Sequence, residues 1–268
     1  MYKLFFIGTG KMATAIAGGI VKSKLFEPAQ IAGFDINEAA ASIFTGATGG
    51  DSFSGKLAQH LEETETVFVA VKPQVIEKAL APYADALKNK VIISIVAGVS
   101  IEKLESLTGS KRIIRVMPNT PALVGKGAAV YSVSAGVEKR DVELVDKIFS
   151  SVGIALQLSE SHLDAVTAVS GSGPAYVFEF IQAMADGGVA EGLPRDIALK
   201  LAAQTVLGAA EMVLKTGAHP QQLKDNVTSP AGTTSRALEV MAARGFSGIV
   251  MQSVRAAAAR SKELGGRK

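Results

Sequence analysis

Two stretches of the chain have residue types and spacings that bind an anionic group. The first, Gly8–Ala13 (GTGKMA), reads G-x-G-x-x-A and joins an expected strand to an expected helix. Gly8 allows a tight turn, Gly10 lets the backbone approach a pyrophosphate, and Ala13 permits close packing of the helix on the sheet. Unpaired N–H groups at the helix N-terminus complete the site. An ordinary glycine-rich turn is the alternative, and the position inside a βαβ pattern favours dinucleotide binding.

The second stretch, Thr228–Thr234 (TSPAGTT), has the pattern of a helix N-terminus. Ser229 is expected to cap the helix, and Pro230 is expected to take its first position. The N–H groups that follow then lack helical partners, which makes a carboxylate site, and the hydroxyl groups of Thr233 and Thr234 can donate or accept hydrogen bonds. A capped helix start that binds nothing is the alternative for these residues taken alone.

Polar residues also follow three expected strands, at the ends where open parallel sheets bind ligands. Asp35 ends the second strand, where an acid usually bonds the ribose hydroxyls and favours NAD over NADP. A solvated turn aspartate is the alternative. Lys72 precedes Pro73 and faces either the cofactor or solvent. Asn119 lies in a loop stiffened by two prolines, which suits either a nicotinamide carboxamide or a plain structural turn.

Short β-branched or aromatic runs alternate with helical stretches in the first half, which predicts βαβ units and a parallel sheet. The expected strands are 3–7, 30–34, 66–71, 91–96, 112–117, 127–133 and 154–158. The expected helices among them are 12–22, 74–87, 101–107 and 137–149. After residue 159 the sequence is rich in Ala, Leu, Met and Val at helical spacing. We therefore expect an α/β fold, with an N-terminal Rossmann-type doubly wound sheet over residues 1–159 and an all-helical domain over residues 160–268.

Composition excludes several classes of protein. The 268 residues are 48% hydrophobic and 20% charged, which excludes a disordered or acidic-tail protein. The chain has no cysteine and three scattered histidines, so we expect no metal site. The net charge of +3 comes without a basic stripe, so no nucleic-acid partner is expected. We see neither a signal peptide nor an apolar run long enough to span a bilayer, and expect a cytoplasmic protein away from membranes.

The helices of the second half are rich in small residues and sparsely charged, as in residues 199–213. A helix that is apolar over most of its circumference must be buried on several sides. We expect a second copy of the chain to bury these helices in a two-fold dimer. Packing on the α/β domain alone is the alternative.

Five motifs in this order resemble the pyrroline-5-carboxylate reductase family over nearly the whole chain. They are residues 6–13 (FIGTGKMA), 70–73 (AVKP), 115–122 (RVMPNTPA), 170–176 (SGSGPAY) and 223–234 (LKDNVTSPAGTT). The resemblance implies reduction of 1-pyrroline-5-carboxylate to L-proline, the last step of proline biosynthesis, by hydride from NADP(H), with NAD(H) as the alternative. It also implies a helical domain that interleaves with its twin, in homodimers and in homodecameric rings of five dimers, and an active site between the cofactor domain and the dimerised helices.

The resemblance, with the residues argued above, also implies a set of site residues. The expected cofactor-binding residues are Ile7, Gly8, Thr9, Gly10, Lys11, Met12, Asp35, Asn37, Ala70, Val71, Lys72, Pro73, Ala97, Met117, Pro118, Asn119 and Asn226. The expected substrate-binding residues are Ser229, Gly232, Thr233 and Thr234, and the expected catalytic residue is Thr234.

The substrate that the resemblance implies is a cyclic imine with a carboxylate. Protonation of its ring nitrogen makes C5 electrophilic enough to accept hydride, so the protein mainly orients the reactants. We expect the carboxylate on the N–H groups of Gly232, Thr233 and Thr234. The Thr234 hydroxyl is expected to hydrogen-bond the ring nitrogen, with at most a modest general-acid role.

Two positions depart from the family pattern. Ala231 replaces the first glycine of a motif that usually reads S-P-G-G-T-T, and Asp35 stands where the family often has Ser or Thr. A carboxylate there would repel the 2′-phosphate of NADPH, although Asn37 or Lys56 can still contact it. We expect NADPH from the usage of the family.

Two other functions are weighed against this one. A β-hydroxyacid dehydrogenase shares the two-domain plan but carries a catalytic lysine after its Ser-Gly-rich stretch, where this chain has 176–180 (YVFEF). A dinucleotide-sensing regulatory protein would need an output surface, such as a helix-turn-helix or a basic face, and the sequence shows neither. The missing lysine favours an imine substrate, and the missing output surface favours an enzyme over a sensor.

Overall fold

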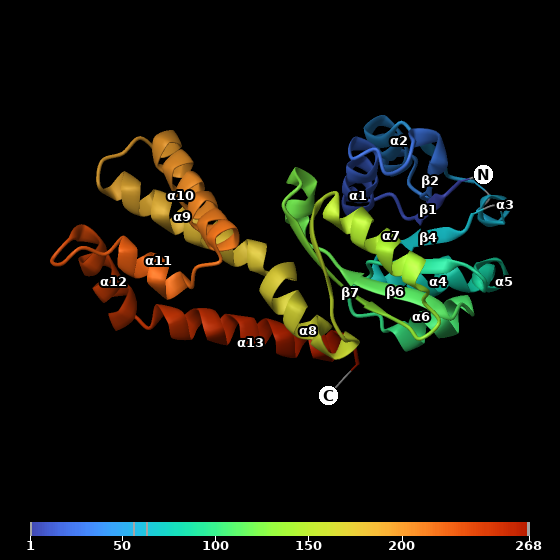
Figure 1. The fold of residues 1–268 in the computed structure, drawn as a ribbon. Coiled ribbons are helices and arrows are strands. Elements are labelled where there is room, and N and C mark those ends of the chain that lie inside the picture. Colours follow the sequence, from blue (N-terminus) through green and yellow to red (C-terminus); the bar gives the residue numbers. More distant parts are fainter. Residues whose placement is uncertain (1, 56, 63, 267–268) are drawn as a thin grey trace. The chain divides into compact units, whose positions relative to one another are not determined.

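The chain divides into two compact units. The computed structural model describes residues 2–55, 57–62 and 64–266. One unit comprises Met1–Ser172 with Ala257–Lys268, and the other comprises Gly173–Ala256. The first unit carries the sheet and the second is helical (Figure 1). By this division, residues 160–172 and the end of the last helix belong to the unit that contains the sheet.

The described residues of the first unit form an eight-stranded sheet in the order β3-β2-β1-β4-β5-β6-β7-β8. The strands are β1 (Leu4–Ile7), β2 (Ile31–Phe34), β3 (Asp51–Phe53), β4 (Thr66–Val69), β5 (Val91–Ser94), β6 (Arg112–Met117), β7 (Gly127–Val133) and β8 (Gly153–Gln157). All neighbours pair in parallel except β6 and β7, which are antiparallel. The winding reverses between β1 and β4, so this doubly wound sheet has its switch point there.

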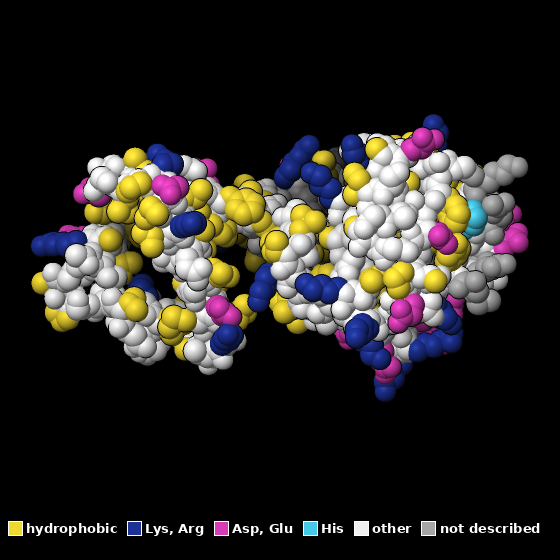
Figure 2. Space-filling model, turned by 90° about the horizontal axis from the view of Figure 1, so that it is seen from above, with side chains coloured by type: hydrophobic (Ala, Val, Ile, Leu, Met, Phe, Trp, Pro, Cys, Tyr) yellow, Lys and Arg dark blue, Asp and Glu magenta, His cyan; other side chains and the backbone are white. Residues whose placement is uncertain are grey.

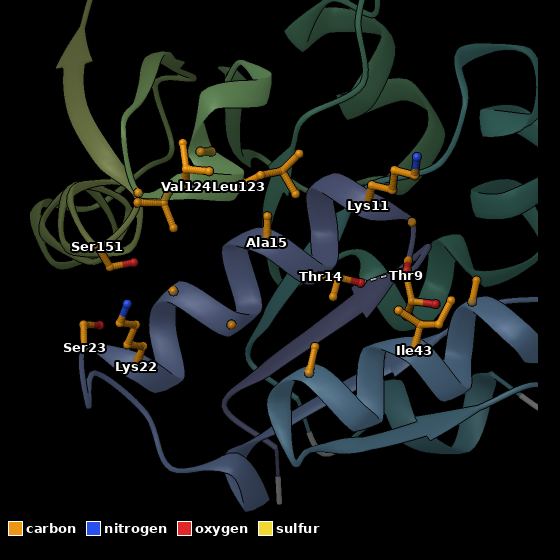
Figure 3. A pocket seen from close by; sticks show the side chains of 18 residues that line it. Thr9, Lys11, Thr14, Ala15, Lys22, Ser23, Ile43, Leu123, Val124 and Ser151 are labelled. Atoms are coloured by element: carbon orange, nitrogen blue, oxygen red, sulfur yellow. Dashed lines mark hydrogen bonds between the residues drawn. The ribbon is translucent and has the colours of Figure 1, made fainter. Parts of the chain in front are cut away.

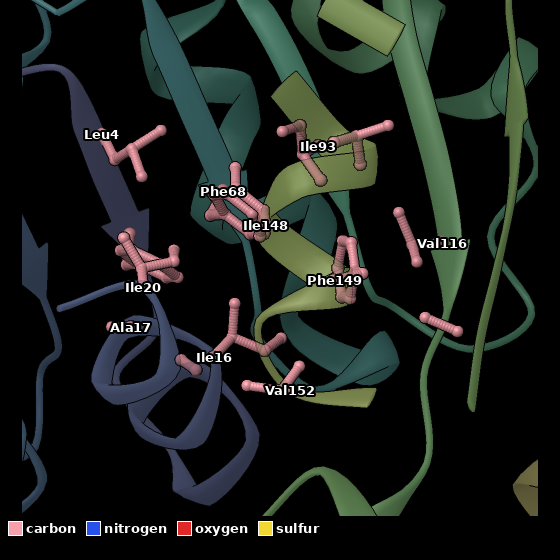
Figure 4. Packing of buried hydrophobic residues seen from close by; sticks show 14 of the residues in the cluster. Leu4, Ile16, Ala17, Ile20, Phe68, Ile93, Val116, Ile148, Phe149 and Val152 are labelled. Carbon is pink, nitrogen blue, oxygen red and sulfur yellow. The ribbon is translucent and has the colours of Figure 1, made fainter. Parts of the chain in front are cut away.

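Helices cover both faces of the sheet (Figure 1). One face carries α1 (Lys11–Lys22), α2 (Glu38–Thr48) and α7 (Lys139–Ser150), and the other carries α3 (Ala58–Leu61), α4 (Ile76–Leu80), α5 (Ala84–Leu87) and α6 (Ile101–Thr108). Side chains alternate between the faces along each strand. Phe6 belongs to the same buried cluster as Ile16 of α1 and Phe149 of α7. Figure 4 shows Ile16 and Phe149 in this cluster. Phe5 belongs to the cluster on the other face, with Leu80 of α4 and Leu104 of α6.

The seven predicted strands are confirmed with small shifts at their ends, and β3 is additional. A three-residue strand is too short for periodicity to detect. Helix α2 was not predicted either; Asn37 starts it, because its Oδ1 accepts hydrogen bonds from the N–H groups of Ala39 and Ala40. The single helix predicted over 74–87 is wrong. A 3₁₀ turn at Ala81–Tyr83 separates α4 from α5, since Pro82 has no N–H to donate and its ring disrupts the preceding turn.

The rest of the chain is helical, as predicted. It comprises α8 (Leu163–Val166), a π-helix (Thr167–Gly171), α9 (Gly173–Ala190), α10 (Arg195–Thr216), α11 (Pro220–Asn226), α12 (Thr233–Ala243) and α13 (Phe246–Leu264). Pro220 takes the first position of α11, whereas Pro194 precedes α10 as its N-cap. Helix α13 begins in the second unit and ends in the first.

The second unit buries little apolar surface by itself. Its buried cluster consists of three alanines, Ala185, Ala198 and Ala202. Large apolar side chains on α9, α10 and α13 are exposed, and Figure 2 shows hydrophobic side chains gathered over these helices. Helix α10 has the length and composition to cross a bilayer, with a mean hydropathy of 1.5 over a window that is 11% buried. No apolar run of this length was expected from the sequence, and α10 is one.

Candidate functional site

A cleft of about 370 Å³ lies at the carboxyl ends of β1, β4, β5 and β6. Its lining residues are Gly10, Lys11, Met12, Ala13, Ala70, Val71, Lys72, Pro73, Ile95, Val96, Ala97, Met117 and Pro118. Parallel strands bring their carboxyl ends to one edge, where open α/β sheets bind ligands. The fold therefore brings together residues from three predicted cofactor motifs that lie up to a hundred positions apart. Ile95 and Val96 line the cleft beside the predicted residue Ala97, because all three follow β5 at the same edge.

Two glycines give the first turn its shape. Gly8 has a φ of +94°, and a Cβ on it would lie 2.7 Å from the carbonyl oxygen of Ala70. No other residue type fits this close approach between the turn and the end of β4. Gly10 is the N-cap of α1, and a Cβ on it would meet nothing within 4 Å. The backbone at Gly10 is thus open to an incoming group.

The Asp35 carboxylate is bonded to the protein's own backbone. Its Oδ2 accepts from the Thr9 N–H at 2.9 Å and from the Thr9 hydroxyl at 3.3 Å, and its Oδ1 accepts from the Asn37 N–H at 2.9 Å. Asp35 thereby ties the end of β2 to the glycine turn. The Asn37 side chain caps α2, as described above. Lys56, expected as a possible phosphate contact, lies outside the described residues.

Asn119 is buried, with 9% of its surface exposed, and both atoms of its amide are used. Its Nδ2 donates to the Ser170 carbonyl oxygen at 3.0 Å, and its Oδ1 accepts from the Ala128 N–H at 2.8 Å. The structure thus gives this side chain two protein partners that the sequence did not predict.

A larger cavity of about 950 Å³ runs along the outer side of α1 (Figure 3). Its walls include Ile43 from α2 and Leu123 and Val124 from the loop after β6, with Lys11 and Lys22 among its lining residues. Only Thr9, Gly10 and Lys11 belong both to it and to the predicted site. It lies away from the carboxyl ends of β4, β5 and β6, so we place the candidate site in the smaller cleft.

The predicted carboxylate site in the second unit has a different local geometry from the one expected. Helix α12 starts at Thr233, with Gly232 as its N-cap. Pro230 and Ala231 form a tight turn that the Gly232 N–H closes on the Ser229 carbonyl at 3.1 Å. The predictions that Ser229 caps the helix and that Pro230 is its first residue are therefore wrong, because proline followed by a residue with positive φ makes a β-turn.

Because α12 begins at Thr233, three residues after Pro230, a different set of N–H groups is free to bind an anion. The Gly232 N–H is used in the turn. Those of Thr233, Thr234 and Ser235 occupy the first turn of α12, and the described hydrogen bonds give them no protein acceptor. Ser235 was missed by the sequence analysis. Its hydroxyl donates to the Gly232 carbonyl at 2.8 Å and so holds the turn against the helix.

Asn226 is the last residue of α11, and it is exposed. Its Oδ1 accepts from Gln222 Nε2 at 3.0 Å. It belongs to the second unit, whereas the cleft belongs to the first, so its contact with a cofactor stays a prediction. Over the described residues, no group of three or more His, Asp or Glu side chains is arranged to hold a metal ion.

Comparison with known proteins assigns the chain to a family. The family model for the pyrroline-5-carboxylate reductase dimerisation domain matches residues 160–264, and that for the coenzyme F420-dependent NADP oxidoreductase domain matches residues 3–98. A pyrroline-5-carboxylate reductase of Arabidopsis thaliana is 46% identical over 98% of this chain and 95% of its own length. This chain belongs to the pyrroline-5-carboxylate reductase family.

Solved structures of the family have the same fold. The Plasmodium falciparum pyrroline carboxylate reductase with NADP bound superposes with a TM-score of 0.88 at 36% identity, covering 98% of both chains. A pyrroline-5-carboxylate reductase of Coxiella burnetii superposes with a TM-score of 0.91 at 32% identity, covering 100% of this chain and 99% of its own. The resemblance inferred from the five motifs is confirmed. Membership of the pyrroline-5-carboxylate reductase family sets aside the hydroxyacid dehydrogenase and sensor alternatives.

Proposed function

We propose that this chain reduces 1-pyrroline-5-carboxylate to L-proline, the last step of proline biosynthesis, with NADPH as the reductant. The cleft at the carboxyl ends of β1, β4, β5 and β6 carries the proposal, because it unites three cofactor motifs of the family at one edge. The reaction itself is inferred from the chain's membership of the pyrroline-5-carboxylate reductase family. The predicted roles of individual residues are part of this proposal.

The residues of the cleft fit a dinucleotide. The backbone at Gly10 is open, and the N–H groups of Lys11, Met12 and Ala13 precede the first intrahelical bond, which runs from the Thr14 N–H to the Gly10 carbonyl. Such a helix N-terminus stabilises a pyrophosphate. Lys72, at the end of β4, lines the same cleft and can offset phosphate charge. The bound dinucleotide supplies a hydride to the substrate.

The first turn of α12 is the proposed site for the imine. We assign the carboxylate to the N–H groups of Thr233, Thr234 and Ser235, in place of the set of Gly232, Thr233 and Thr234 that the sequence predicted. The Thr234 hydroxyl is the donor or acceptor for the ring nitrogen. Hydride addition to a protonated C=N bond leaves a neutral amine, so Thr234 orients the nitrogen and need not be a strong acid.

Self-association completes the proposal. The match to the dimerisation domain and the exposed apolar side chains of α9, α10 and α13 support a homodimer in which a second copy covers these helices. This also accounts for the apolar length of α10 without a membrane. A homodecameric ring of five dimers is proposed from the family resemblance alone, as is the cytoplasmic location.

The test is a turnover assay with the purified protein, 1-pyrroline-5-carboxylate and either NADPH or NADH. We expect dinucleotide oxidation that depends on the imine, with proline as the product and NADPH preferred. Preference for NADH would leave the proposed reaction standing and would support the expectation that Asp35 favours NAD. Absence of turnover with both dinucleotides would overturn the proposed function.

A further inference from the structure

Asn119 joins three segments at the carboxyl edge of the sheet. It follows Met117 and Pro118, both of which line the cleft. Its side chain bonds Ala128 at the start of β7 and the Ser170 carbonyl in the π-helix. Both partners lie within the same compact unit. A single buried amide thus connects the cleft loop, a sheet strand and an irregular helical turn.

The π-helix makes a close contact with the cleft loop at the residue next to Ser170. A Cβ on Gly171 would lie 2.5 Å from Met117 Cε, so the glycine permits the approach. The irregular turn closes with a bond of 2.7 Å from the Ser172 N–H to the Thr167 carbonyl. Single π turns inside helices are rare and occur frequently at functional sites. The amide of Asn119 holds the Ser170 carbonyl of this turn on the loop side.

The contact between Gly171 and Met117 lies toward the β6 end of the cleft. Asp35 at the end of β2 marks the side of the adenosine ribose, and the glycine turn of β1 marks the pyrophosphate. The nicotinamide half therefore lies toward β5 and β6, where Met117 is found. Met117 forms part of the wall at that end, and Gly171 lies against its side chain.

We propose that Asn119 is a positioning residue for hydride transfer. It holds the Ser170–Gly171 backbone against Met117 and so fixes the wall of the nicotinamide end of the cleft. The inference rests on the proposed function, since it concerns the same reaction. Small displacements of a reactant from its attack geometry are costly, about 100-fold in rate for about 1 Å. Loss of the Ser170 bond should act on turnover more than on dinucleotide affinity.

Asn119→Asp tests the proposal. The variant has the same shape and keeps an acceptor for the Ala128 N–H, but it sets a carboxylate oxygen against the Ser170 carbonyl. We expect kcat to fall by about 10- to 100-fold, with the dinucleotide dissociation constant nearly unchanged. The primary isotope effect from 4-deuterated dinucleotide should rise, because hydride transfer becomes slower relative to the other steps.

Ser134→Ala is the matched control. Ser134 makes the same pair of bonds at the opposite end of β6: its hydroxyl donates to the Lys111 carbonyl at 2.6 Å and accepts from the Ile113 N–H at 2.9 Å. It is similarly buried, at 8% exposure. We expect a comparable fall in melting temperature from both variants, but an unchanged kcat and isotope effect in Ser134→Ala.

A second variant covers the case in which Asn119→Asp does not fold. Gly171→Ala puts its new methyl group against the mobile end of Met117, which can move aside, so the fold should survive while the wall shifts. It should lower kcat and raise the isotope effect in the same way. If folded Asn119 and Gly171 variants behave like Ser134→Ala, the positioning role is overturned. A wild-type protein without turnover would instead overturn the proposed function.

Discussion

At the scale of single residues, the partners of a side chain decide what it does. Asp35 and Asn119 both stand where the sequence predicts cofactor contacts, and both make several hydrogen bonds to the protein itself. Asp35 stabilises the glycine turn, and Asn119 ties loop to helix. Ala231 differs from both. Its backbone has a φ of +56°, which is strained for a residue with a Cβ, and its methyl group makes no hydrogen bond that could offset the strain.

Asp35 should still influence the choice of cofactor through its charge. We predict that Asp35→Asn, which keeps an acceptor for the Thr9 N–H, raises the preference for NADPH over NADH about tenfold, because a carboxylate near a 2′-phosphate is repelled by it. The kcat/KM values for the two dinucleotides measure this. Asp85→Asn, at an exposed position on α5, should leave the ratio unchanged, and an equal ratio in both variants would show that the Asp35 charge has no effect.

Thr234 is expected to matter for turnover and not for dinucleotide binding. Thr234→Ala removes the hydroxyl that orients the ring nitrogen, and we predict a fall in kcat of about 100-fold. Titration of the dinucleotide should give the wild-type affinity. Thr216→Ala is the control, since the Thr216 hydroxyl donates to the Met212 carbonyl at 2.7 Å and accepts from the Ala218 N–H at 3.1 Å, both at the end of α10. Unchanged turnover in Thr234→Ala would remove the residue from the mechanism.

Ala231→Gly should stabilise the protein. Left-handed backbone costs a residue with a Cβ about 1–2 kcal/mol, whereas the extra freedom of glycine in the unfolded chain costs about 0.5–1 kcal/mol. We predict a net gain of about 0.5–1 kcal/mol, measured by reversible denaturation. Ala243→Gly, at the end of α12 in ordinary helix, should lose stability. A loss in both would contradict the strain assigned to the turn.

At the scale of elements, buried ion pairs and hydrogen bonds fix how a helix packs on the sheet. Arg112 on β6 makes bonds of 2.8 to 3.1 Å to the Asp141 carboxylate on α7, with side chains 18% and 5% exposed. Those hydrogen bonds raise the pKa of Arg112, against the opposing effect of burial. Asp141 also accepts from the Glu138 N–H at 3.1 Å and so caps its own helix.

We predict that Asp141→Asn destabilises the first unit by about 3–5 kcal/mol, because it removes the short, buried ion pair of Arg112 and leaves that charge the longer pair with exposed Glu65, at 4.0 Å. Denaturant unfolding measures this. Lys139→Ala, on the same helix, breaks only the exposed pair with Glu143 at 3.9 Å and should cost less than about 1 kcal/mol. Equal effects from the two variants would mean that the buried pair contributes no more than a surface one.

At the scale of the whole molecule, the second unit has more apolar surface than it can bury alone. Leu207 on α10 is 51% exposed, and Leu214 is 77% exposed. A soluble helix with this character needs a partner surface. Self-association of the chain provides it in the proposed function.

Leu207→Glu should therefore shift the protein toward smaller species, since a charge in an apolar interface loses its hydration. Sedimentation velocity over a range of concentrations measures this. Lys200→Glu, on the same helix at a position that already carries a charge, should keep the wild-type distribution. A wild-type protein that sediments as a monomer at every concentration would contradict the dimer.

The sequence by itself determined seven strands of the sheet, the glycine turn and the family. These follow from short-range patterns: apolar runs of strand length, the spacing of Gly8 and Gly10, and motifs of a few residues. Only the tertiary structure decided the start of α12, the break near Pro82 and the partners of Asp35 and Asn119. The last two depend on bonds between residues far apart in the chain, which the order of the strands brings together and no local pattern records.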